Sequence, residues 1–338
     1  MGRFVVLLLT VCMLACSGSL PGPPTGAAAQ VAAGSGRPEA VRLWQDASIF
    51  SLIGGLIASA QRRVLVEVYE LGRAALVVSL GVRRSAGVDV RVITDPTVLA
   101  NKASVLSLGR LRVPERLYPV DDGRRQIDHV KLLIADGEAV VGGMNWGAHS
   151  DRNHDYVLET RVTEEIDRLV RIFEQDWALA GGRPAPLAAV RSEIAQTAPG
   201  DEIRTMLESA LTGARQRVLA EMFTLTDPVV IAELAEAHRR GVVVRVLLDP
   251  HQPYNRRAYD LLKSSGVEVR WFPIPRGVLL HAKIGLFDSV LMLGSANWTF
   301  SGLGVNHELD IETQDPDAVA AYKARFNSDW ARSAGWLG

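Results

Sequence analysis

The sequence has almost no cysteine. Its 338 residues include two cysteines, Cys12 and Cys16, and both lie at the very start of the chain. Because residues 17–338 carry no thiol, this part of the chain cannot form an internal disulfide or use a cysteine nucleophile. Binding of zinc or an iron–sulfur cluster through cysteine is excluded there as well. Any chemistry in the body of the protein therefore depends on other side chains.

The chain also lacks a surplus of charge of one sign. It has 37 basic and 38 acidic residues, which gives a formal net charge of −1. This argues against a protein held to nucleic acid mainly by its overall positive charge. The net charge does not exclude a local basic cleft. With 48% hydrophobic and 22% charged residues, the composition is globular. The length allows one large domain or two domains of moderate size.

The hydrophobic run at the N-terminus is too short to span a bilayer. Phe4–Ala15 follows a positively charged start, and a spanning helix needs roughly 20 residues. The run is typical of a secretory signal peptide over residues 1–16, with a buried helix as the alternative. Met13–Cys16 resembles a lipoprotein processing box, with Cys16 as the lipidated residue, and Ala27–Ala29 is a competing cleavage site. Residues 17–39, rich in Gly, Pro, Ala and Ser, predict a flexible tether. We therefore expect export to a bacterial periplasm or cell envelope, with anchoring through Cys16, or secretion.

An internal repeat organises the rest of the chain. Two segments of the first half, Arg63–Tyr69 and Gly87–Pro96, recur as Arg217–Phe223 and Gly241–Pro250, each 154 positions later. This is a duplicated unit of about 150 residues rather than a solenoid of short repeats. We predict one lobe over residues 40–180, a linker over 181–199 and a second lobe over 200–338.

Both halves show the same order of strand and helix patterns. Short apolar or β-branched runs predict strands, and amphipathic runs predict helices between and after them. This order indicates the α/β class, with two pseudo-symmetric lobes, each a mixed β-sheet flanked by helices. Such a duplication makes a shared site at the lobe interface natural. In the first half we expect strands at 64–69, 88–94, 130–134, 139–141 and 156–162, and helices at 74–85 and 164–179; in the second, strands at 218–223, 242–248, 282–287, 290–293 and 308–313, and helices at 229–240 and 316–331.

A chemical motif occurs once in each half. The pattern is His-x-Lys-x4-Asp, followed by Gly-Gly-x-Asn or Gly-Ser-x-Asn. A His and a Lys two positions apart on a strand point to the same face. The chain has five lysines against 32 arginines, and two of the five occupy this slot, where a compact ammonium donor is useful. The members are His129, Lys131, Asp136 and Asn145 in the first half, and His281, Lys283, Asp288, Ser295 and Asn297 in the second.

These paired motifs resemble the phospholipase D superfamily, over about residues 45–333. The resemblance implies phosphodiester chemistry through a phosphohistidine, with His129 as the nucleophile and His281 as the acid; the reverse order stays open. Independently, one imidazole can attack phosphorus while the other protonates the leaving oxygen. The two motif lysines, Asn145 and Asn297 would bind the phosphoryl oxygens, and the hydroxyl of Ser295 would bind phosphate or support the imidazole.

The remaining residues of the predicted site have supporting roles. The resemblance implies that Asp155 and Glu308 orient the imidazoles. Asp136 and Asp288 complete the catalytic motifs, and we expect them to secure the motif loops more than to touch substrate. His154 and His307 are interpreted as structural or rim residues. Trp146 and Trp298 fit a substrate groove and core packing equally well. We expect no cofactor and no metal, because the spacing of His149, Asp151 and His154 matches no usual tetrahedral pattern.

The leading functional hypothesis is an exported enzyme, a phosphoric diester hydrolase of the phospholipase D type. It would act on phospholipid at a membrane surface, by hydrolysis or by transfer to an alcohol. One alternative is a metal-independent endonuclease, favoured by Arg124, Arg125, Arg256 and Arg257 and opposed by the absence of a basic balance. A lesser alternative is a catalytically silent binding protein. Because both motifs lie in one chain, we expect a monomer.

Overall fold

The computed structural model describes residues 40–183, 193–198, 200–274 and 277–334. The predicted signal peptide and tether, residues 1–39, lie outside the described residues. Residues from Glu39 onward form one compact unit, and the following description concerns this unit. None of the helices in the described residues is both long and apolar enough to cross a membrane.

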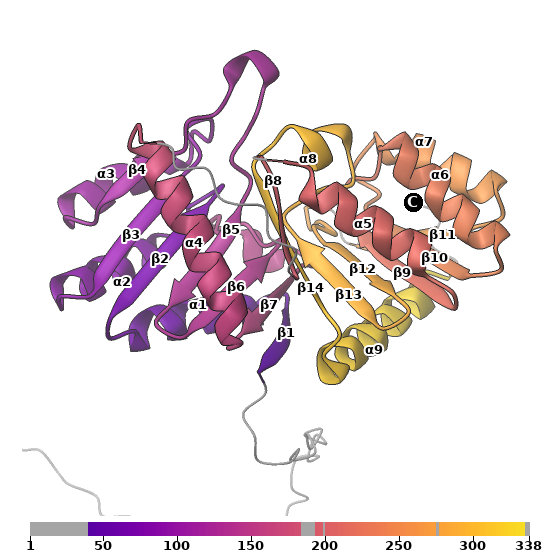
Figure 1. Ribbon diagram of the computed structural model, residues 1–338, viewed down its shortest axis with the longest axis horizontal. Helices are drawn as coiled ribbons and strands as arrows, with labels where there is room; N and C mark the ends of the chain where they lie inside the picture. Colours follow the sequence, from indigo (N-terminus) through magenta and orange to yellow (C-terminus); the bar gives the residue numbers. More distant parts are fainter. Residues whose placement is uncertain (1–39, 184–192, 199, 275–276, 335–338) are drawn as a thin grey trace, which may run out of the picture. The chain divides into compact units, whose positions relative to one another are not determined.

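Each half of the unit is built on a seven-stranded mixed sheet, and the two sheets have the same layout (Figure 1). In the first sheet the order is β1-β7-β6-β5-β2-β3-β4, where β2, β3 and β4 run parallel and the other pairs are antiparallel. The second has the equivalent order β8-β14-β13-β12-β9-β10-β11. The first-half strands are β1 Val41–Gln45, β2 Arg63–Val68, β3 Asp89–Thr94, β4 Glu115–Leu117, β5 Lys131–Ala135, β6 Glu138–Gly142 and β7 Tyr156–Thr160; the second-half strands are β8 Ile194–Thr197, β9 Arg217–Met222, β10 Val243–Leu248, β11 Glu268–Trp271, β12 Lys283–Phe287, β13 Val290–Gly294 and β14 Glu308–Thr313.

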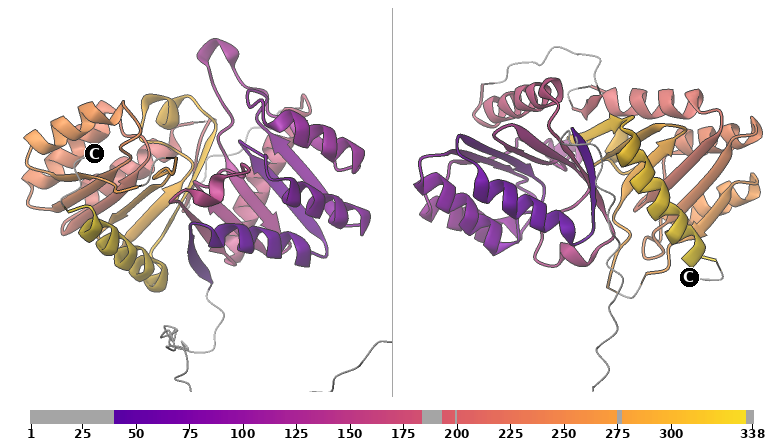
Figure 2. Two further views of the ribbon diagram at one scale, coloured as in Figure 1. Left: turned by 180° about the vertical axis from the view of Figure 1, so that it is seen from behind. Right: turned by 90° about the horizontal axis from the view of Figure 1, so that it is seen from below.

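Helices cover both faces of each sheet. In each half, three helices pack on the outer face of the sheet. One long helix packs on the inner face, which is also the face turned toward the sheet of the second lobe or, for that lobe, of the first (Figure 2). In the first half these are α1 Ser48–Ser59, α2 Ala74–Ser85 and α3 Asn101–Arg110, opposed by α4 Thr163–Ala180; in the second they are α5 Glu202–Gly213, α6 Pro228–Arg239 and α7 Asn255–Ser264, opposed by α9 Pro316–Arg332. The short helices η1 Asp122–Arg124, η2 Ser150–Arg152 and α8 Phe300–Gly304 lie in the connections.

Local signals in the sequence explain several helix ends. α6 begins at Pro228 after Asp227, whose carboxylate accepts hydrogen bonds from the backbone N–H groups of Val229 and Val230 at 3.0 and 3.2 Å. Glycines follow the ends of α2 and α6 at equivalent repeat positions. Gly87 and Gly241 adopt φ of 88° and 89°, a backbone region that side chains other than glycine disfavour.

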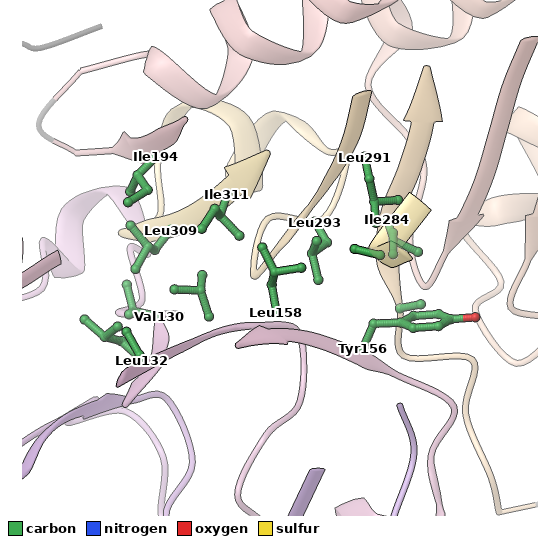
Figure 3. Packing of buried hydrophobic residues seen from close by; sticks show 14 of the residues in the cluster. Val130, Leu132, Tyr156, Leu158, Ile194, Ile284, Leu291, Leu293, Leu309 and Ile311 are labelled. Atoms are coloured by element: carbon green, nitrogen blue, oxygen red, sulfur yellow. The ribbon is translucent and has the colours of Figure 1, made fainter. Parts of the chain in front are cut away.

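The two halves share one hydrophobic core between their sheets. In β2 the alternate residues Val64 and Val66 face the outer helices, and Leu65 faces the second half. Figure 3 shows Leu158 of β7 opposite Leu293 of β13. Burial of a Leu side chain contributes about 1.5–3 kcal/mol. This packing therefore fixes the two halves against each other and places the motif segments at their common boundary.

The predicted strands and helices are all present, within a few residues of the expected bounds. The predicted linker, 181–199, differs from the structure because it contains β8. This strand pairs with β14 as the edge strand of the second sheet, as β1 pairs with β7 in the first. The second half therefore begins before residue 200. The sequence interpretation also missed α1, α3, α5 and α7, together with the edge strands β1, β4 and β11.

Candidate active site

The two motif histidines lie two residues before β5 and β12, at the boundary between the halves. The backbone N–H of His129 donates to the carbonyl oxygen of His307 at 2.8 Å, and that of His281 donates to the carbonyl oxygen of His154 at 2.8 Å. Each motif segment is therefore tied by its backbone to the opposite half. The preceding residues are held as well, since the backbone N–H groups of Asp128 and Leu280 donate to Asp95 and Asp249 at 2.6 and 2.7 Å.

Each imidazole is oriented by a carboxylate from the other half. His129 Nδ1 lies 2.9 Å from Glu308 Oε2, and His281 Nδ1 lies 2.7 Å from Asp155 Oδ2. All four side chains are almost completely buried. An Nδ1–H donated to a carboxylate leaves the lone pair on Nε2, the state that a nucleophile or general base requires. The expected orienting acids are thus at the site, with their partners exchanged between the halves.

The two motif lysines lie beside the imidazoles. Lys131 Nζ donates to the carbonyl oxygen of His129. Lys283 Nζ donates to the carbonyl oxygen of His281 at 2.5 Å and lies 3.0 Å from both ring nitrogens of that residue. Aromatic rings cover both ammonium groups, with Tyr69 5.2 Å from Lys131 Nζ and Phe223 5.0 Å from Lys283 Nζ. Tyr69 and Phe223 occupy equivalent repeat positions.

Burial alters the charge states of these groups. Burial lowers the pKa of Lys131 to about 7 and that of Lys283 to about 8, although the carboxylates of Glu308 and Asp155 oppose the effect. Burial and the neighbouring Lys283 lower the pKa of His281 to about 4. The pKa of His129 is also lowered by burial, against the attraction of Glu308.

Glu308 keeps its negative charge in this setting. Burial alone would raise its pKa, but His129, Lys131 and a hydrogen bond from Ser295 outweigh burial and leave the pKa lowered. The two lysines act electrostatically on both imidazoles. The motif residues of the two halves therefore form one coupled site.

The asparagines are placed to receive a ligand. Asn145 and Asn297 follow β6 and β13, and both side chains are half-buried. Their buried Oδ1 atoms have no hydrogen-bond partner among the described residues. A non-bridging phosphoryl oxygen accepts hydrogen bonds, so the Nδ2 groups of these amides are the atoms that could donate to it.

Ser295 does not match the predicted phosphate-binding role. Its hydroxyl donates to Glu308 Oε2 at 2.6 Å and accepts from the backbone N–H of Leu309 at 3.0 Å. Its carbonyl oxygen lies 3.1 Å from His129 Nδ1. Ser295 therefore positions Glu308 and His129 and is fully engaged within the protein.

Asp136 and Asp288 lie away from the imidazoles. Each follows the far end of the strand that begins with the motif lysine, and five residues of strand span roughly 16 Å. The Asp136 carboxylate accepts the backbone N–H groups of Gln61, Arg62 and Arg63 at 2.7, 2.8 and 2.9 Å. Asp288 does the same for residues 215–217, at 2.8 Å in each case. These contacts secure the turn, as expected for a structural role, and do not bring either carboxylate to the reacting groups.

Four other residues from the sequence interpretation lie in the interior. Trp146 and Trp298 are 2% exposed and pack in the cores of their own halves, so they do not line a groove. His154 and His307 are buried between the halves among carboxylates, which agrees with the structural interpretation and excludes a place on an exposed rim.

Sequence reasoning missed two acids that hold the site. Asp95 and Asp249, from the Asp-Pro pairs that end β3 and β10, fix the backbone just before the catalytic histidines. The signal was present, because both Asp-Pro pairs recur at the repeat distance. In the sequence, the two Asp-Pro pairs indicate the duplication, but they do not by themselves indicate a role in the site.

Comparison with known proteins identifies the family. A family model described as "Cardiolipin synthase, PLD-like domain" matches residues 53–177 and 207–330, one match in each half. The chain belongs to the phospholipase D-like family. This phospholipase D-like chain is 30% identical over 133 residues to mitochondrial cardiolipin hydrolase of Homo sapiens, covering 39% of the chain and 52% of that protein. It is 27% identical over 231 residues to cardiolipin synthase A of Pseudomonas putida (strain GB-1), covering 61% of the chain and 48% of that protein.

The chain spans about half the length of these two curated relatives. The crystal structure of phosphatidylserine synthase from Haemophilus influenzae Rd KW20 superposes with a TM-score of 0.69 at 13% identity, covering 88% of this chain and 87% of that one. At this identity the likeness concerns the fold, and it confirms the two-lobed phospholipase D-like architecture that the motifs predicted.

Proposed function

We propose that this phospholipase D-like protein cleaves phosphodiester bonds of phospholipids through a phosphohistidine intermediate. The observation that carries the proposal is the crossed pairing of two buried imidazoles with two buried carboxylates, with a lysine beside each imidazole. This arrangement supplies a nucleophile, an acid–base group and phosphoryl-binding cations without a further group.

In the first step, Nε2 of one imidazole attacks phosphorus and a P–N bond forms. The P–O bond to the leaving alcohol breaks, and the second imidazole, protonated, gives its proton to that oxygen. In the second step the same imidazole, now neutral, takes a proton from water while the water oxygen attacks phosphorus and the P–N bond breaks. An acceptor alcohol in place of water gives transphosphatidylation.

We assign the attack to His129. Its Nε2 has no hydrogen-bond partner among the described residues, and its Nδ1 faces two acceptors, the Glu308 carboxylate and the Ser295 carbonyl oxygen. His281 Nε2 instead lies 3.0 Å from Lys283 Nζ. An imidazole whose proton is opposed by a nearby ammonium is a strong acid once protonated, which suits the leaving-group step.

A phospholipid substrate is supported by the relatives, named for cardiolipin hydrolysis and synthesis. It is also supported by exposed apolar side chains close to the site in sequence. Leu99, Tyr254 and Phe300 are 75%, 71% and 71% exposed. The first two follow Asp95 and Asp249 in loops after β3 and β10, and Phe300 begins α8 just after Asn297. Arg256 and Arg257 next to Tyr254 are exposed too. Apolar and cationic side chains together favour an anionic membrane surface.

We extend the proposal to location and assembly. The N-terminal sequence supports export, with Cys16 as the lipid-anchored residue, and this would place the enzyme beside its substrate. Incorporation of labelled palmitate into the full chain, lost in Cys16→Ser, tests the anchor. A single chain supplies both motifs, which supports a monomer.

The experiment that tests the activity is a substrate panel. Purified protein is incubated with vesicles of phosphatidylglycerol, cardiolipin or phosphatidylcholine, with plasmid DNA, and with a soluble bis-aryl phosphodiester. Headgroup release from vesicles is the expected result. Nicked plasmid without lipid turnover would replace the proposal by the nuclease alternative, which the exposed Arg124 and Arg125 favour. Inactivity on every substrate would indicate a binding protein.

A further inference from the structure

Two buried charged clusters lie between the halves, outside the catalytic site, and they are related by the repeat. One surrounds His154 and contains Glu221 and Asp329. The other surrounds His307 and contains Glu67 and Asp176. In each, the histidine comes from one half and the two carboxylates from the other. An aromatic ring stacks on each imidazole, Phe272 at 4.9 Å and Tyr118 at 4.4 Å between ring centroids.

The cluster around His154 is balanced in charge. Its three carboxylates are Glu221, Asp329 and Asp46, which lies 2.7 Å from His154 Nδ1. The imidazole and two arginines oppose them. Arg325 contacts Asp329 at 2.9 Å and Asp46 at 3.0 Å, and Arg332 pairs with Asp329.

The cluster around His307 lacks these cations. Ile172 and Leu179 occupy the repeat positions of Arg325 and Arg332, at the separation of 153 that relates His154 to His307. Asp128 replaces Leu280 and adds a third carboxylate. Arg168, the buried arginine of α4, pairs instead with Glu202 at 3.4 Å.

The cluster around His307 therefore lacks the two arginine charges of its counterpart, at a place without solvent access. Glu67, Asp128, Asp176 and His307 are each 0% exposed. Lys131 also lies within electrostatic reach of Asp128, but its ammonium is held at the catalytic site by the His129 carbonyl oxygen. Uncompensated buried charges are strongly disfavoured, so the carboxyl groups of this cluster must either hold protons or bind a cation.

The geometry of the cluster points to that source. His307 Nδ1 lies 2.6 Å from the backbone carbonyl oxygen of Ala198 and donates its proton there, so Nε2 is the nitrogen that faces the carboxylates. This is the hydrogen bond that metal-binding histidines make with their other nitrogen. His307 Nε2 lies 3.1 Å from Asp176 Oδ2 and 3.3 Å from Glu67 Oε1. Ligand atoms about 2.0–2.1 Å from a tetrahedral ion lie about 3.3 Å from one another.

Unpaired oxygens complete the donor set. Glu67 Oε2, Asp176 Oδ1 and Asp128 Oδ2 have no hydrogen-bond partner among the described residues. We propose that a divalent first-row transition-metal ion binds between Glu67, Asp176 and His307. One imidazole nitrogen with carboxylate oxygens suits Zn²⁺ or Mn²⁺. Because the ligands come from both halves, the ion cross-links them and enters as the halves close during folding.

The test measures bound metal rather than catalysis, so it is independent of the proposed function. The full chain is unfolded with a chelator, refolded with Zn²⁺ or with Mn²⁺, desalted and analysed by elemental mass spectrometry. We expect about one ion per chain and a melting temperature several degrees above that of protein refolded without metal. In Glu67→Gln and Asp176→Asn the bound metal should fall to about zero.

Glu221→Gln is the matched control, because it changes the equivalent carboxylate of the balanced cluster. It should retain the ion. Wild-type protein that binds neither ion on refolding overturns the proposal and shows that the carboxyl groups hold protons instead. Equal loss of metal in Glu221→Gln and Glu67→Gln also overturns it. If the two variants of the proposed site fail to fold, the metal content of the wild type still decides.

Discussion

His281 Nδ1, in the second half of the chain, lies 2.7 Å from Asp155 Oδ2, in the first half. The converse pair, His129 with Glu308, closes at 2.9 Å. Each half therefore supplies the histidine that the other half orients, and neither half contains a complete site. The duplication within one chain keeps both crossed pairs together at every concentration.

The first prediction concerns this crossing. Asp155→Asn should lower turnover at least about 10²-fold, because an amide no longer fixes the proton on Nδ1 of its partner. The affected ring should be that of His281, although Asp155 lies in the motif region of His129. Nitrogen NMR shifts of the labelled imidazoles show which ring nitrogen of His281 and of His129 carries the proton. A tautomer change at His129, with His281 unaltered, would contradict the crossed assignment.

The second prediction follows from the difference between Gly143 and Ser295, which occupy equivalent positions. A Cβ at Gly143 would lie 2.4 Å from Asp155 Oδ1. Gly143→Ala should therefore displace the Asp155 carboxylate and reduce activity on the order of 10²-fold. Ser295→Ala removes one hydrogen bond to Glu308 and should cost about tenfold or less. Steady-state rates of the two purified variants, with circular dichroism to check folding, make the comparison. Equal losses would show that the two positions are interchangeable.

Much of this architecture was predictable because the same pattern of strands, helices and motif residues occurs in both halves of the sequence. The Val-rich strands, the glycines after two helices and the motif lysines all recur in register. α3 and α7 escaped prediction because few apolar residues mark their buried side; α3 buries Asn101, Ser104 and Leu108 and leaves Leu106 exposed. β8 escaped because four residues beside a Pro- and Gly-rich stretch carry too little pattern.

The motif histidines, their lysines and the orienting acids were predictable from the sequence, but which acid faces which imidazole was not. Spacing places Asp155 after His129 along the chain and says nothing of which imidazole it faces across the lobe boundary. The role of Ser295 could not be decided from the sequence for a related reason. A hydroxyl beside a phosphate-binding asparagine can bind either a phosphoryl oxygen or a neighbouring carboxylate. In the structure the Ser295 hydroxyl binds the carboxylate of Glu308 on β14.

The third prediction is an opposite pH response of activity and stability. The pKa of Lys131 is lowered by burial to about 7 and that of Lys283 to about 8. Their ammonium forms bind phosphate, so kcat/KM should fall as the pH rises through about 7 to 8, where first Lys131 and then Lys283 loses its proton. The free energy of unfolding should change in the other direction. Above the folded pKa the unfolded chain still binds a proton that the folded protein has lost, so these lysines add stability as the pH rises toward their ordinary value of 10.5.

Denaturant unfolding at pH 7 to 9.5 tests the expected rise in stability, and initial rates over the same range test the expected fall in kcat/KM. Lys131→Met should show a flatter rise of stability with pH than the wild type, because the buried amine is gone. Wild-type activity that stays constant to the top of this range would refute the proposed role of the ammonium groups.

The fourth prediction concerns the exposed apolar side chains near the site. Replacing Leu99, Tyr254 and Phe300 together by Ser should weaken binding to phosphatidylglycerol vesicles about tenfold or more, since each apolar side chain contributes about 1 kcal/mol on partial burial. Vesicle sedimentation measures the binding. Turnover of the soluble bis-aryl phosphodiester should stay within about twofold of wild type, because none of the three is assigned to the chemistry.

Val78→Ser with Val82→Ser is the matched control, since both valines are exposed on α2 at 56% and 54%. Equal weakening in that control would remove the case for a specific membrane face.

The fifth prediction assigns the nucleophile by separating the two chemical steps. With a bis-aryl phosphodiester the leaving phenolate needs no acid, so His281→Ala should still form the covalent intermediate on His129 and release one equivalent of phenol. It should then stall, because the base that activates water is missing, and steady turnover should fall on the order of 10⁴-fold or more. His129→Ala should give neither the burst nor the label. Alkaline quenching preserves phosphohistidine, and peptide mapping locates the phosphoryl group. A label on His281 in His129→Ala, with none on His129 in His281→Ala, would reverse the roles while leaving the two-histidine scheme intact, because both imidazoles have the same kind of crossed carboxylate partner.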